Sequence, residues 1–294
     1  MVMNSDNTMS GVYYALTAYI FWGVVPVYFK WVDHVSPWEI LAHRVIWALI
    51  LLLVILAWTR QLSELRIPLR QLPKLLLTSV LLATNWLVFI YAVVNNNIAE
   101  TALGYFINPL VSVFLGVIIL REYLRPLQWI AVAITATGIL SQLVIFGRAP
   151  WIALALAFSF GFYGLFRKNL GLHAIGGLAI ETAMVVPFAI AFLAWSGWQG
   201  QLAFGDHLPT DLLLVLGGFV TSFPLLCFAA AVKRLSLTTM GMFQYLAPSI
   251  SLALAVFVYA EPFDPGRAVT FICIWIALAI FTFEAWMHHR RRPI

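Results

Sequence analysis

Apolar residues fill ten stretches of this chain, and polar residues gather in the short segments between them. Each stretch is about 20 residues long, the length that an α-helix needs to cross the hydrocarbon core of a membrane. No connection exceeds about 16 residues, so a separate soluble domain has no room. The pattern predicts an all-α integral membrane protein with ten transmembrane helices, at 11–30, 38–58, 75–95, 98–120, 126–146, 150–166, 175–195, 211–232, 237–259 and 268–287.

The chain also contains an internal repeat. A Pro, a Glu and a second Pro recur at the same spacing 139 residues further on, as Pro109, Glu122 and Pro126 and then as Pro248, Glu261 and Pro265. A self-similar pair at a fixed offset indicates two related halves. We expect five helices in each half, at 11–146 and 150–287, with a basic tail at 288–294. Because five is odd, the second half enters the membrane from the opposite side, which makes a 5+5 inverted repeat.

Composition supports a membrane protein, because 63% of the residues are hydrophobic and only 10% are charged. The formal charge of +5 follows the membrane and does not indicate a nucleic-acid partner. Most Lys and Arg fall on one side of the predicted membrane, in 60–74, 121–125, 167–168, 233–234 and 290–292. This asymmetry predicts that both termini are cytoplasmic. The run 290–292 is a stop-transfer anchor or, alternatively, a contact to membrane lipid headgroups.

Helix 38–58 carries the first unusual charge. Ser36 to Glu39 has the spacing of a capping box, which explains Glu39 locally. His43 and Arg44 follow, and Arg44 lies roughly 12 Å below Ser36 by helical rise. An arginine at that depth costs at least ~2.5 kcal/mol unless it is paired or hydrated. Two interpretations stay open: Arg44 snorkels or forms a structural ion pair, or it lines a water-filled cavity.

Helix 175–195 carries the second unusual charge. This is Glu181, which lies roughly 9 Å inside the cytoplasmic end of the helix by helical rise. No Lys or Arg shares its local turn. An unpaired carboxylate in this position could exchange protons, which makes Glu181 and His43 the candidates for proton coupling. The alternative is a neutral, hydrogen-bonded acid that holds helices together. A second capping box, Asn97 with Glu100, gives Glu100 a structural role.

Two prolines interrupt corresponding helices of the two halves. Pro109 and Pro248 remove the hydrogen bonds to the carbonyls of Tyr105 and Gln244, so we expect a kink at each proline. Such irregular backbone is tolerated at membrane depth where it faces protein or water. Its occurrence in both halves favours a shared central cavity. Polar and aromatic residues on several helices are predicted to line it: Trp22, His43, Arg44, Asn85, Trp86, Tyr105, Asn108, Glu181, Gln244 and Tyr245.

Several segments resemble a known family. They are Phe21-Trp22-Gly23, His43-Arg44-Val45-Ile46-Trp47, Gly104-Tyr105-Phe106-Ile107-Asn108-Pro109-Leu110 and Pro224-Leu225-Leu226-Cys227-Phe228. With the ten helices and the repeat, they are similar to the EamA branch of the drug/metabolite transporter superfamily, closest to RarD-type permeases. The resemblance spans about residues 11 to 287. It implies a permease of the bacterial inner membrane with both termini inside. Members of this group commonly carry a chloramphenicol-sensitivity or -resistance label.

The resulting hypothesis is a secondary transporter of small metabolites or drug-like compounds that works by alternating access. Arg44 would counter an anionic group, and the aromatic residues would stack on an apolar or ring moiety. No sequence pattern points to a cofactor, a metal site or an enzyme: His-Glu-x-x-His is absent, and the one aspartate within the predicted spans is Asp211, at the first position of 211–232. The rival interpretations are an intramembrane enzyme on a lipid-linked substrate and a channel or non-transporting membrane protein.

Overall fold

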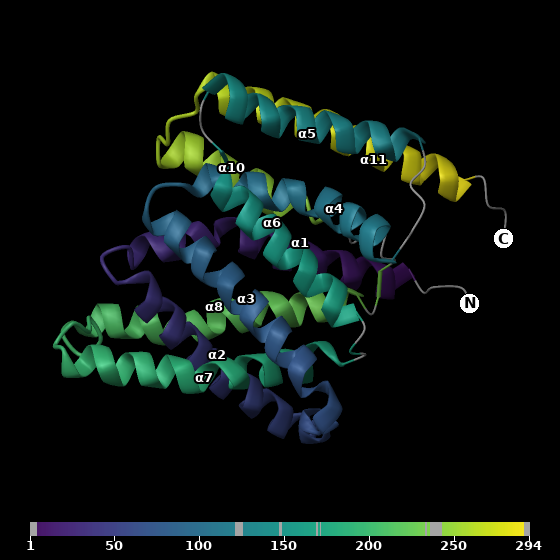
Figure 1. The fold of residues 1–294 in the computed structure, drawn as a ribbon. Helices are drawn as coiled ribbons and strands as arrows, with labels where there is room; N and C mark the ends of the chain where they lie inside the picture. The colour runs from purple at the N-terminus through teal and green to yellow at the C-terminus, as the bar shows by residue number, and fades with distance from the viewer. Residues whose placement is uncertain are drawn as a thin grey trace.

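The computed structural model describes residues 5–120, 126–146, 149–168, 170, 172–232, 234–235 and 243–290. Helices dominate this part of the chain, and none of the described residues is in a strand. The first half supplies α1 (Ser5–Trp31), α2 (Pro37–Trp58), α3 (Leu72–Val94), α4 (Ile98–Leu120) and α5 (Pro126–Phe146) (Figure 1). The second half supplies α6 (Trp151–Lys168), α7 (Ala174–Trp198), α8 (Leu208–Val232), α10 (Leu246–Ala253) and α11 (Pro265–Arg290).

The helix boundaries agree with the hydrophobic pattern, but the number of clear spans does not. Two short 3₁₀ turns, Leu62–Leu65 and Leu69–Gln71, fill the loop between α2 and α3. Five helices of the described residues are long and apolar enough to cross a membrane, namely Met9–Trp31, Pro37–Trp58, Leu69–Val94, Ala174–Trp198 and Leu208–Ala231. The other apolar helices found among those residues are shorter. The prediction of ten spans is therefore confirmed for five of them.

Helix contacts follow a two-fold pattern. The repeat matches α1 with α6, α2 with α7, α3 with α8, α4 with α10 and α5 with α11. The pairs α2–α7, α4–α10 and α5–α11 then map onto themselves. The pair α1–α8 maps onto α3–α6, α2–α8 maps onto α3–α7, and α1–α10 maps onto α4–α6. The two halves of the repeat are thus packed as equivalents.

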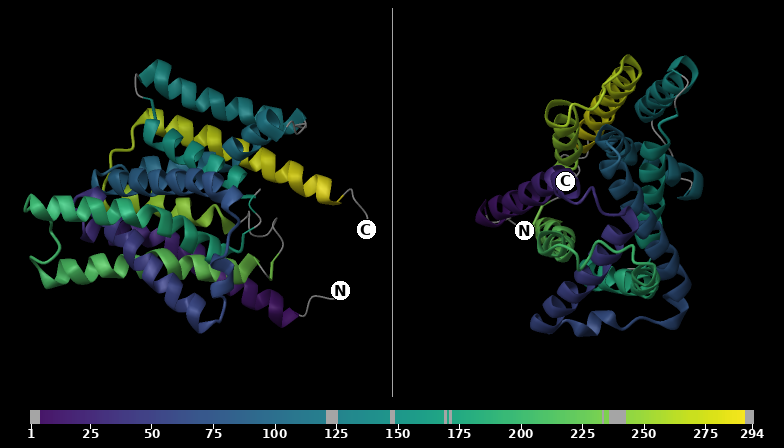
Figure 2. Two further views of the ribbon diagram at one scale, coloured as in Figure 1. Left: turned by 60° about the horizontal axis from the view of Figure 1, so that its bottom comes forward. Right: turned by 90° about the vertical axis from the view of Figure 1, so that its left-hand side faces the viewer.

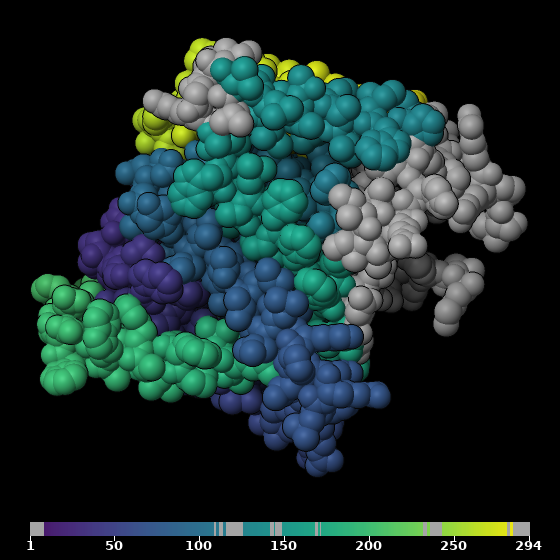
Figure 3. All heavy atoms as spheres, in the orientation of Figure 1, coloured from purple at the N-terminus to yellow at the C-terminus, as the bar shows by residue number. Residues whose placement is uncertain are grey.

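The helices form a bundle with one pair set to its side. Helices α5 and α11 lie side by side along one edge, and their apolar residues Ala131, Phe271 and Ile274 share a core with α4 (Figures 1 and 2). In the space-filling view, the atoms of α3 (blue) and α6 (teal) lie against each other on the face toward the viewer (Figure 3). The start of α1 and the end of α11 lie on the same side of the molecule (Figures 1 and 2).

The predicted capping box at the start of α2 is wrong. Ser36 makes no side-chain cap bond. Glu39 is 1% exposed and reaches the loop between α7 and α8, where its carboxylate accepts hydrogen bonds from Ala203 N (3.0 Å) and Phe204 N (2.9 Å). A carboxylate in this position satisfies backbone donors that would otherwise be buried without partners. Glu39 therefore joins the first half to the second and does not cap its own helix.

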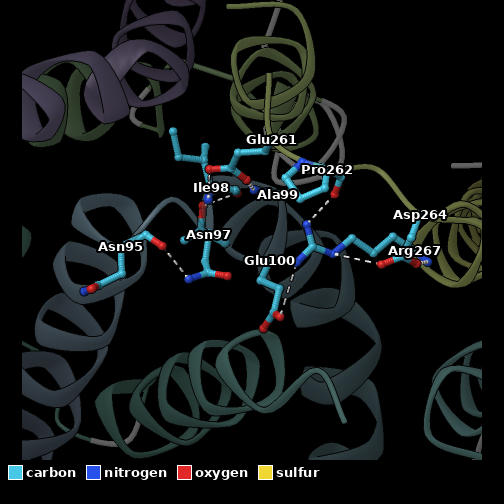
Figure 4. A network of polar contacts seen from close by, with 10 residues as sticks. Asn95, Asn97, Ile98, Ala99, Glu100, Glu261, Pro262, Asp264 and Arg267 are labelled. Carbon is cyan, nitrogen blue, oxygen red and sulfur yellow. Dashed lines mark hydrogen bonds and ion pairs between the residues drawn. The ribbon is translucent and has the colours of Figure 1, made fainter. Parts of the chain in front are cut away.

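The predicted capping box at the start of α4 is also wrong. Asn97 Nδ2 donates to Asn95 O (2.8 Å), and Glu100 lies 3.9 Å from an Nη of Arg267 (Figure 4). The first N–H groups of α4 belong to Ile98 and Ala99. The acceptor that they use comes from the other half of the chain.

That acceptor is Glu261, which follows α10. Ile98 N donates to Oε1 (2.7 Å) and Ala99 N donates to Oε2 (2.9 Å), and the side chain is only 5% exposed (Figure 4). An anion at the positive end of a helix is further stabilised by the helix dipole. Its repeat counterpart Glu122 lies outside the described residues. Glu261 thus has the structural role that its position at a helix end favours.

A third carboxylate joins the halves at the opposite end of the bundle. Glu64, in the loop between α2 and α3, accepts a hydrogen bond from Gly176 N in the first turn of α7 (3.3 Å). Its other oxygen lies 3.7 Å from His173 Nδ1. Gly176 leaves space for the carboxylate, because a Cβ there would lie 2.8 Å from Oε2. Both ends of the bundle are therefore closed by carboxylates that bind backbone of the partner half.

The two prolines behave differently. Helix α4 continues through Pro109 as one helix. The span expected at 237–259 is described from residue 243, and there the chain makes a turn at Gln244 and Tyr245 before α10 begins. Pro248 thus sits in the first turn of α10, where a proline costs little. The helix then ends in one π-helical turn, Leu254–Val258, which is a further irregularity.

Replacing Glu261 with alanine should destabilise the protein by about 2 kcal/mol, because two buried N–H groups of α4 lose their acceptors. The thermal unfolding midpoint of the purified protein measures this loss. Asp206→Asn is the control, since Asp206 is exposed in the loop between α7 and α8. Equal midpoints for the two variants would show that Glu261 does not hold the halves together.

Candidate functional site

The candidate site is built around Arg44, two turns into α2. Here α8 approaches α2 very closely because two glycines face it. A Cβ at Gly218 would lie 2.5 Å from the backbone carbonyl carbon of Trp47, and one at Gly217 would lie 3.6 Å from Arg44 Cα. This close approach brings α8 side chains within reach of the arginine. Small residues at a helix interface commonly serve this purpose in membranes.

The Arg44 guanidinium is held by a hydroxyl and aromatic rings. Its Nε donates to Thr221 Oγ1 of α8 (2.6 Å). Its Cζ lies 4.5 Å from the ring centroid of Trp86 and 5.6 Å from that of Phe29. The rings come from α3 and α1 of the first half and Thr221 comes from α8 of the second, so the helices that surround Arg44 belong to both halves. A cation over an aromatic face is attracted by the ring quadrupole.

No carboxylate among the described residues pairs with Arg44, and no described group accepts from its two Nη groups. The side chain is half-buried although it lies well inside the bundle. The phenols of Tyr28 and Tyr105 are the nearest groups that interact with its charge. Tyr28 is held in place because its hydroxyl donates to Leu213 O (2.9 Å). Arg44 thus presents open N–H donors to the interior of the bundle.

Such an arrangement suits an anionic group. The planar guanidinium can donate two parallel hydrogen bonds to a carboxylate or phosphate, and these bonds are strong where water is scarce. Trp86, Phe29 and Tyr105 add flat apolar walls beside it. The geometry therefore supports the cavity interpretation of Arg44 over an ion pair.

The predicted residue Asn108 also fits a cavity. It follows Tyr105 by three residues on α4, so the two share one face of that helix. Asn108 is 3% exposed, and its Oδ1 is buried with no hydrogen-bond partner among the described residues. A buried polar atom without a partner is costly unless a bound molecule or water completes it. Tyr105 packs its ring 5.9 Å from that of Phe89.

Asn85 makes its described hydrogen bonds to α6. It is 1% exposed, and its Nδ2 donates to Leu156 O and Ser159 Oγ of α6, both at 3.0 Å. The side chain thus holds α3 to α6, which is the alternative that a polar residue in a membrane helix always offers. Among the described contacts, none joins Asn85 to the Arg44 guanidinium.

His43 and Trp22 lie beside Arg44 in sequence or space but make separate contacts. The His43 ring stacks on Phe204 at 4.5 Å, under the loop that Glu39 anchors. Its Nε2 is buried and has no hydrogen-bond partner among the described residues. Trp22 belongs to an aromatic cluster with Tyr19 and Phe228, at 5.4 and 5.7 Å. Neither residue has a described contact to the Arg44 guanidinium.

Gln244 and Tyr245 are half-buried in the turn before α10. The Tyr245 ring stacks on Phe106 of α4 at 6.4 Å. Phe106 precedes Ile107 and follows Tyr105, so it faces a different side of α4 from the tyrosine of the site. Among the described contacts, none joins this turn to Arg44.

Glu181 is not the unpaired carboxylate that the sequence predicts. Arg167 of α6 places an Nη 3.5 Å from Oε1, and Tyr163 OH donates to Oε2 (3.1 Å). Thr78 of α3 also forms a side-chain hydrogen bond with this carboxylate. Thr78 and Trp86 are eight residues apart on α3, so the Glu181 cluster lies about 12 Å from the Arg44 site along that helix. The basic partner was missed because it comes from another helix.

Sequence reasoning missed three residues of the Arg44 site, namely Tyr28, Phe29 and Thr221. Tyr and Phe are abundant in this chain, so their presence on α1 gave no signal. Thr221 precedes Ser222, and a polar pair in the middle of an apolar helix is a sequence signal for a polar contact with another helix.

The fold and the site together define a class. A multi-pass helical bundle of two equivalent halves, with an open cation at its centre, is the architecture of a membrane transporter. The model of the EamA-like transporter family matches this chain twice, at residues 9–143 and 148–283. The chain belongs to that family, and it is accordingly a multi-pass membrane protein of the bacterial inner membrane.

Relatives extend over nearly the whole chain. Protein RarD of Escherichia coli strain K12 is 45% identical over 98% of this chain and 99% of its own. An "uncharacterized transporter" of Vibrio cholerae is 42% identical over 97% and 95%. A "chloramphenicol-sensitive protein RarD" of Pseudomonas aeruginosa is 30% identical over 92% of both chains. The resemblance to RarD-type permeases is thus confirmed.

One solved crystal structure shares the fold. It superposes with a TM-score of 0.61 and covers 97% of this chain and 100% of its own. The sequences are 19% identical, so this likeness concerns the fold alone.

The two glycines of α8 should respond differently to alanine. Gly218→Ala should destabilise the protein by about 2 kcal/mol, because the new Cβ meets backbone of α2 that cannot yield. Gly217→Ala should cost less, about 1 kcal/mol, since its Cβ meets the end of the Tyr28 side chain at 2.8 Å, and a side chain with one hydrogen bond shifts more easily than helix backbone. Thermal unfolding measures both, with Gly164→Ala as the control in open space. The reverse order would contradict the packing described here.

Proposed function

We propose that this chain is a secondary carrier that moves a small molecule with an anionic group by alternating access. One observation carries the proposal: Arg44 lies inside the bundle with open Nη donors and no described carboxylate partner. A buried cation without a counter-ion is expensive, and a substrate anion would offset that cost. A structural arginine would be expected to have an internal partner instead.

The repeat supports alternating access. Five helices in each half make the second half an inverted copy, and all ten helices would span the membrane with both termini in the cytoplasm. Inverted halves can exchange conformations, which opens the central site first to one side and then to the other. The two-fold pattern of helix contacts is what such an exchange requires.

The cavity favours an anion attached to a ring or another flat apolar group. Arg44 would bind the anion, and Trp86, Tyr105 and Phe29 would flank the apolar part. Asn108 offers a buried carbonyl oxygen for a donor of the substrate. Metabolites with a carboxylate, including amino acids, fit this description. The name of one relative adds chloramphenicol as a compound to test.

Proton coupling is the second part of the proposal, with Glu181 and His43 as its residues. The Glu181 carboxylate is fully buried, and protonation would release Arg167 from its ion pair. His43 Nε2 has no partner in the described chain and could receive a proton. Substrate or proton gradients would then supply the energy of transport.

A carrier is preferred over the rival functions. A channel would be expected to have a continuous polar stripe, whereas apolar clusters separate the Arg44 and Glu181 sites. An intramembrane enzyme would need a nucleophile or metal cluster, and no group of three or more His, Cys, Asp or Glu among the described residues is placed to hold a metal. Three relatives whose names state a role are named as transporters.

A thermal-stability screen of the purified full-length protein tests the binding site. Carboxylate metabolites, amino acids and chloramphenicol are added one at a time, because a ligand of the folded state raises the melting temperature. We expect one compound class to stabilise the wild type by about 2.7 kcal/mol at 100 times its dissociation constant. In Arg44→Ala the affinity should fall by roughly tenfold or more, since a charge-assisted contact is lost.

The matched control is Arg70→Ala, because Arg70 is exposed in the loop between α2 and α3. It should respond to the compound as the wild type does. A stabilising compound that acts equally on Arg44→Ala would contradict the proposed site. Counterflow of the labelled compound in liposomes then separates a carrier from a channel, since only a carrier saturates and exchanges.

A further inference from the structure

Glu181 occupies the same place in α7 that Arg44 occupies in α2. Arg44 follows the first residue of its helix, Pro37, by seven positions. Glu181 follows the first residue of its helix, Ala174, by the same seven. Helices α2 and α7 are counterparts in the repeat and pack against each other. The two charged residues are therefore equivalent by position.

Each charged residue also has a hydroxyl partner on α8 or on its counterpart α3, although the two threonines stand at different positions of these helices. Arg44 bonds to Thr221, which begins the pair Thr221-Ser222 on α8. Glu181 bonds to Thr78, which begins a Thr-Ser pair on α3, the counterpart of α8. Thr221 accepts from Arg44 and donates to Gly217 O (2.9 Å), whereas the single hydroxyl proton of Thr78 is shared between Leu75 O (3.0 Å) and the Glu181 carboxylate.

An aromatic residue completes each position, Phe29 from α1 beside Arg44 and Tyr163 from the counterpart α6 beside Glu181. The two sites thus use corresponding helices of the repeat, although the partner residues on those helices differ. The charges of the two sites are opposite.

The two sites differ in what fills them. Arg44 has open donors, whereas Glu181 is filled by the guanidinium of Arg167, whose side chain is only 15% exposed. Arg167 reaches the carboxylate across Gly177, since a Cβ at that position would lie 1.9 Å from Nη2. The same Nη2 also donates to His173 O (3.1 Å). Any side chain at 177 would therefore push this cation away from Glu181.

The other charged groups nearby are already engaged. Glu64 faces the start of α7 and is bound by Gly176 N and by His173. Helix α3 presents Thr78, and α6 presents Tyr163 together with Arg167. Within the described chain, Arg167 is thus the cation that neutralises Glu181.

We infer that Glu181, Thr78 and Tyr163 form a second half-site, one that accepts a cation, and that Arg167 occupies it as an internal stand-in in this conformation. The inference rests on the proposed carrier function. When the halves exchange conformations, α7 takes the surroundings that α2 has here, and Glu181 faces the cavity without Arg167. The ligand is then a proton or a cationic group of the substrate.

The separation of the two half-sites makes them act in turn. Arg44 and Glu181 each lie seven positions from the start of their helix. If the two helices are antiparallel and as long as α2, these positions are about 10 Å apart along the helix axis. A small zwitterion such as an amino acid does not span that distance. The cavity therefore presents a different charge in each conformation. It presents Arg44, which binds the substrate anion, in one conformation and Glu181, which favours release of that anion, in the other.

Removal of the Arg167 side chain from the Glu181 half-site tests the inference in the purified full-length protein. In Arg167→Ala, millimolar methylguanidinium chloride should raise the melting temperature by about 3 °C relative to equal potassium chloride. The wild type, in which Arg167 fills the site, should not respond. In a second arm without methylguanidinium, a change from about pH 8 to about pH 6 should stabilise Arg167→Ala if the proton is the preferred cation. Either response should vanish in Arg167→Ala with Glu181→Gln.

A second variant covers the case in which Arg167→Ala does not fold. Gly177→Ala keeps both charges but displaces the Arg167 guanidinium, and Gly164→Ala on α6 is its control because a Cβ there meets nothing within 4 Å. Gly177→Ala should respond to methylguanidinium or acid, and Gly164→Ala should not. The inference is overturned if neither cation stabilises the emptied site, or if the effect survives Glu181→Gln. No transported compound is added, so this failure would leave the Arg44 site and the carrier function standing.

Discussion

The backbone N–H groups at helix starts impose the constraint on which this structure depends. In a membrane, water does not complete them, so the protein has to supply acceptors. Four buried or half-buried carboxylates do so, and each reaches into the opposite half: Glu39 to the loop at Ala203, Glu261 to Ile98 and Ala99, Glu64 to Gly176, and Glu100 to Ile152 and Ala153. None of them caps its own helix. The two halves are consequently held together by bonds whose loss would leave buried donors unpaired.

These bonds also bear on how the molecule could move. Glu39 and Glu261 act at one end of the bundle and Glu64 at the other, so each end is closed by contacts between the halves. A carrier that exposes its centre to one side at a time has to weaken one set while it keeps the other. The Arg167–Glu181 pair lies beside the Glu64 contact, at the start of α7. Opening that end would therefore separate a charge pair and free a carboxylate in the same movement.

Charge burial explains why the centre is built as it is. Arg44 is surrounded by rings and one hydroxyl, which stabilise a cation without neutralising it. Glu181 has a full counter-ion at 3.5 Å. Both occupy equivalent places, and both depend on glycines that let a neighbouring helix or side chain come close, Gly217 and Gly218 for one and Gly177 for the other. The repeat thus supplied one scaffold, and the side chains on it diverged in charge.

The amino-acid sequence by itself determined the helices, the repeat and the family, because apolar length and internal offset are local properties that packing does not alter. It also placed Arg44 and Glu181 at membrane depth. Only the tertiary structure decided their partners. Asn85 bonds to α6, Glu39 and Glu100 leave their predicted caps, and Arg167 reaches Glu181 from another helix. Each of these contacts joins residues on different elements, and the pattern along one helix cannot specify which side chain a neighbouring helix will present.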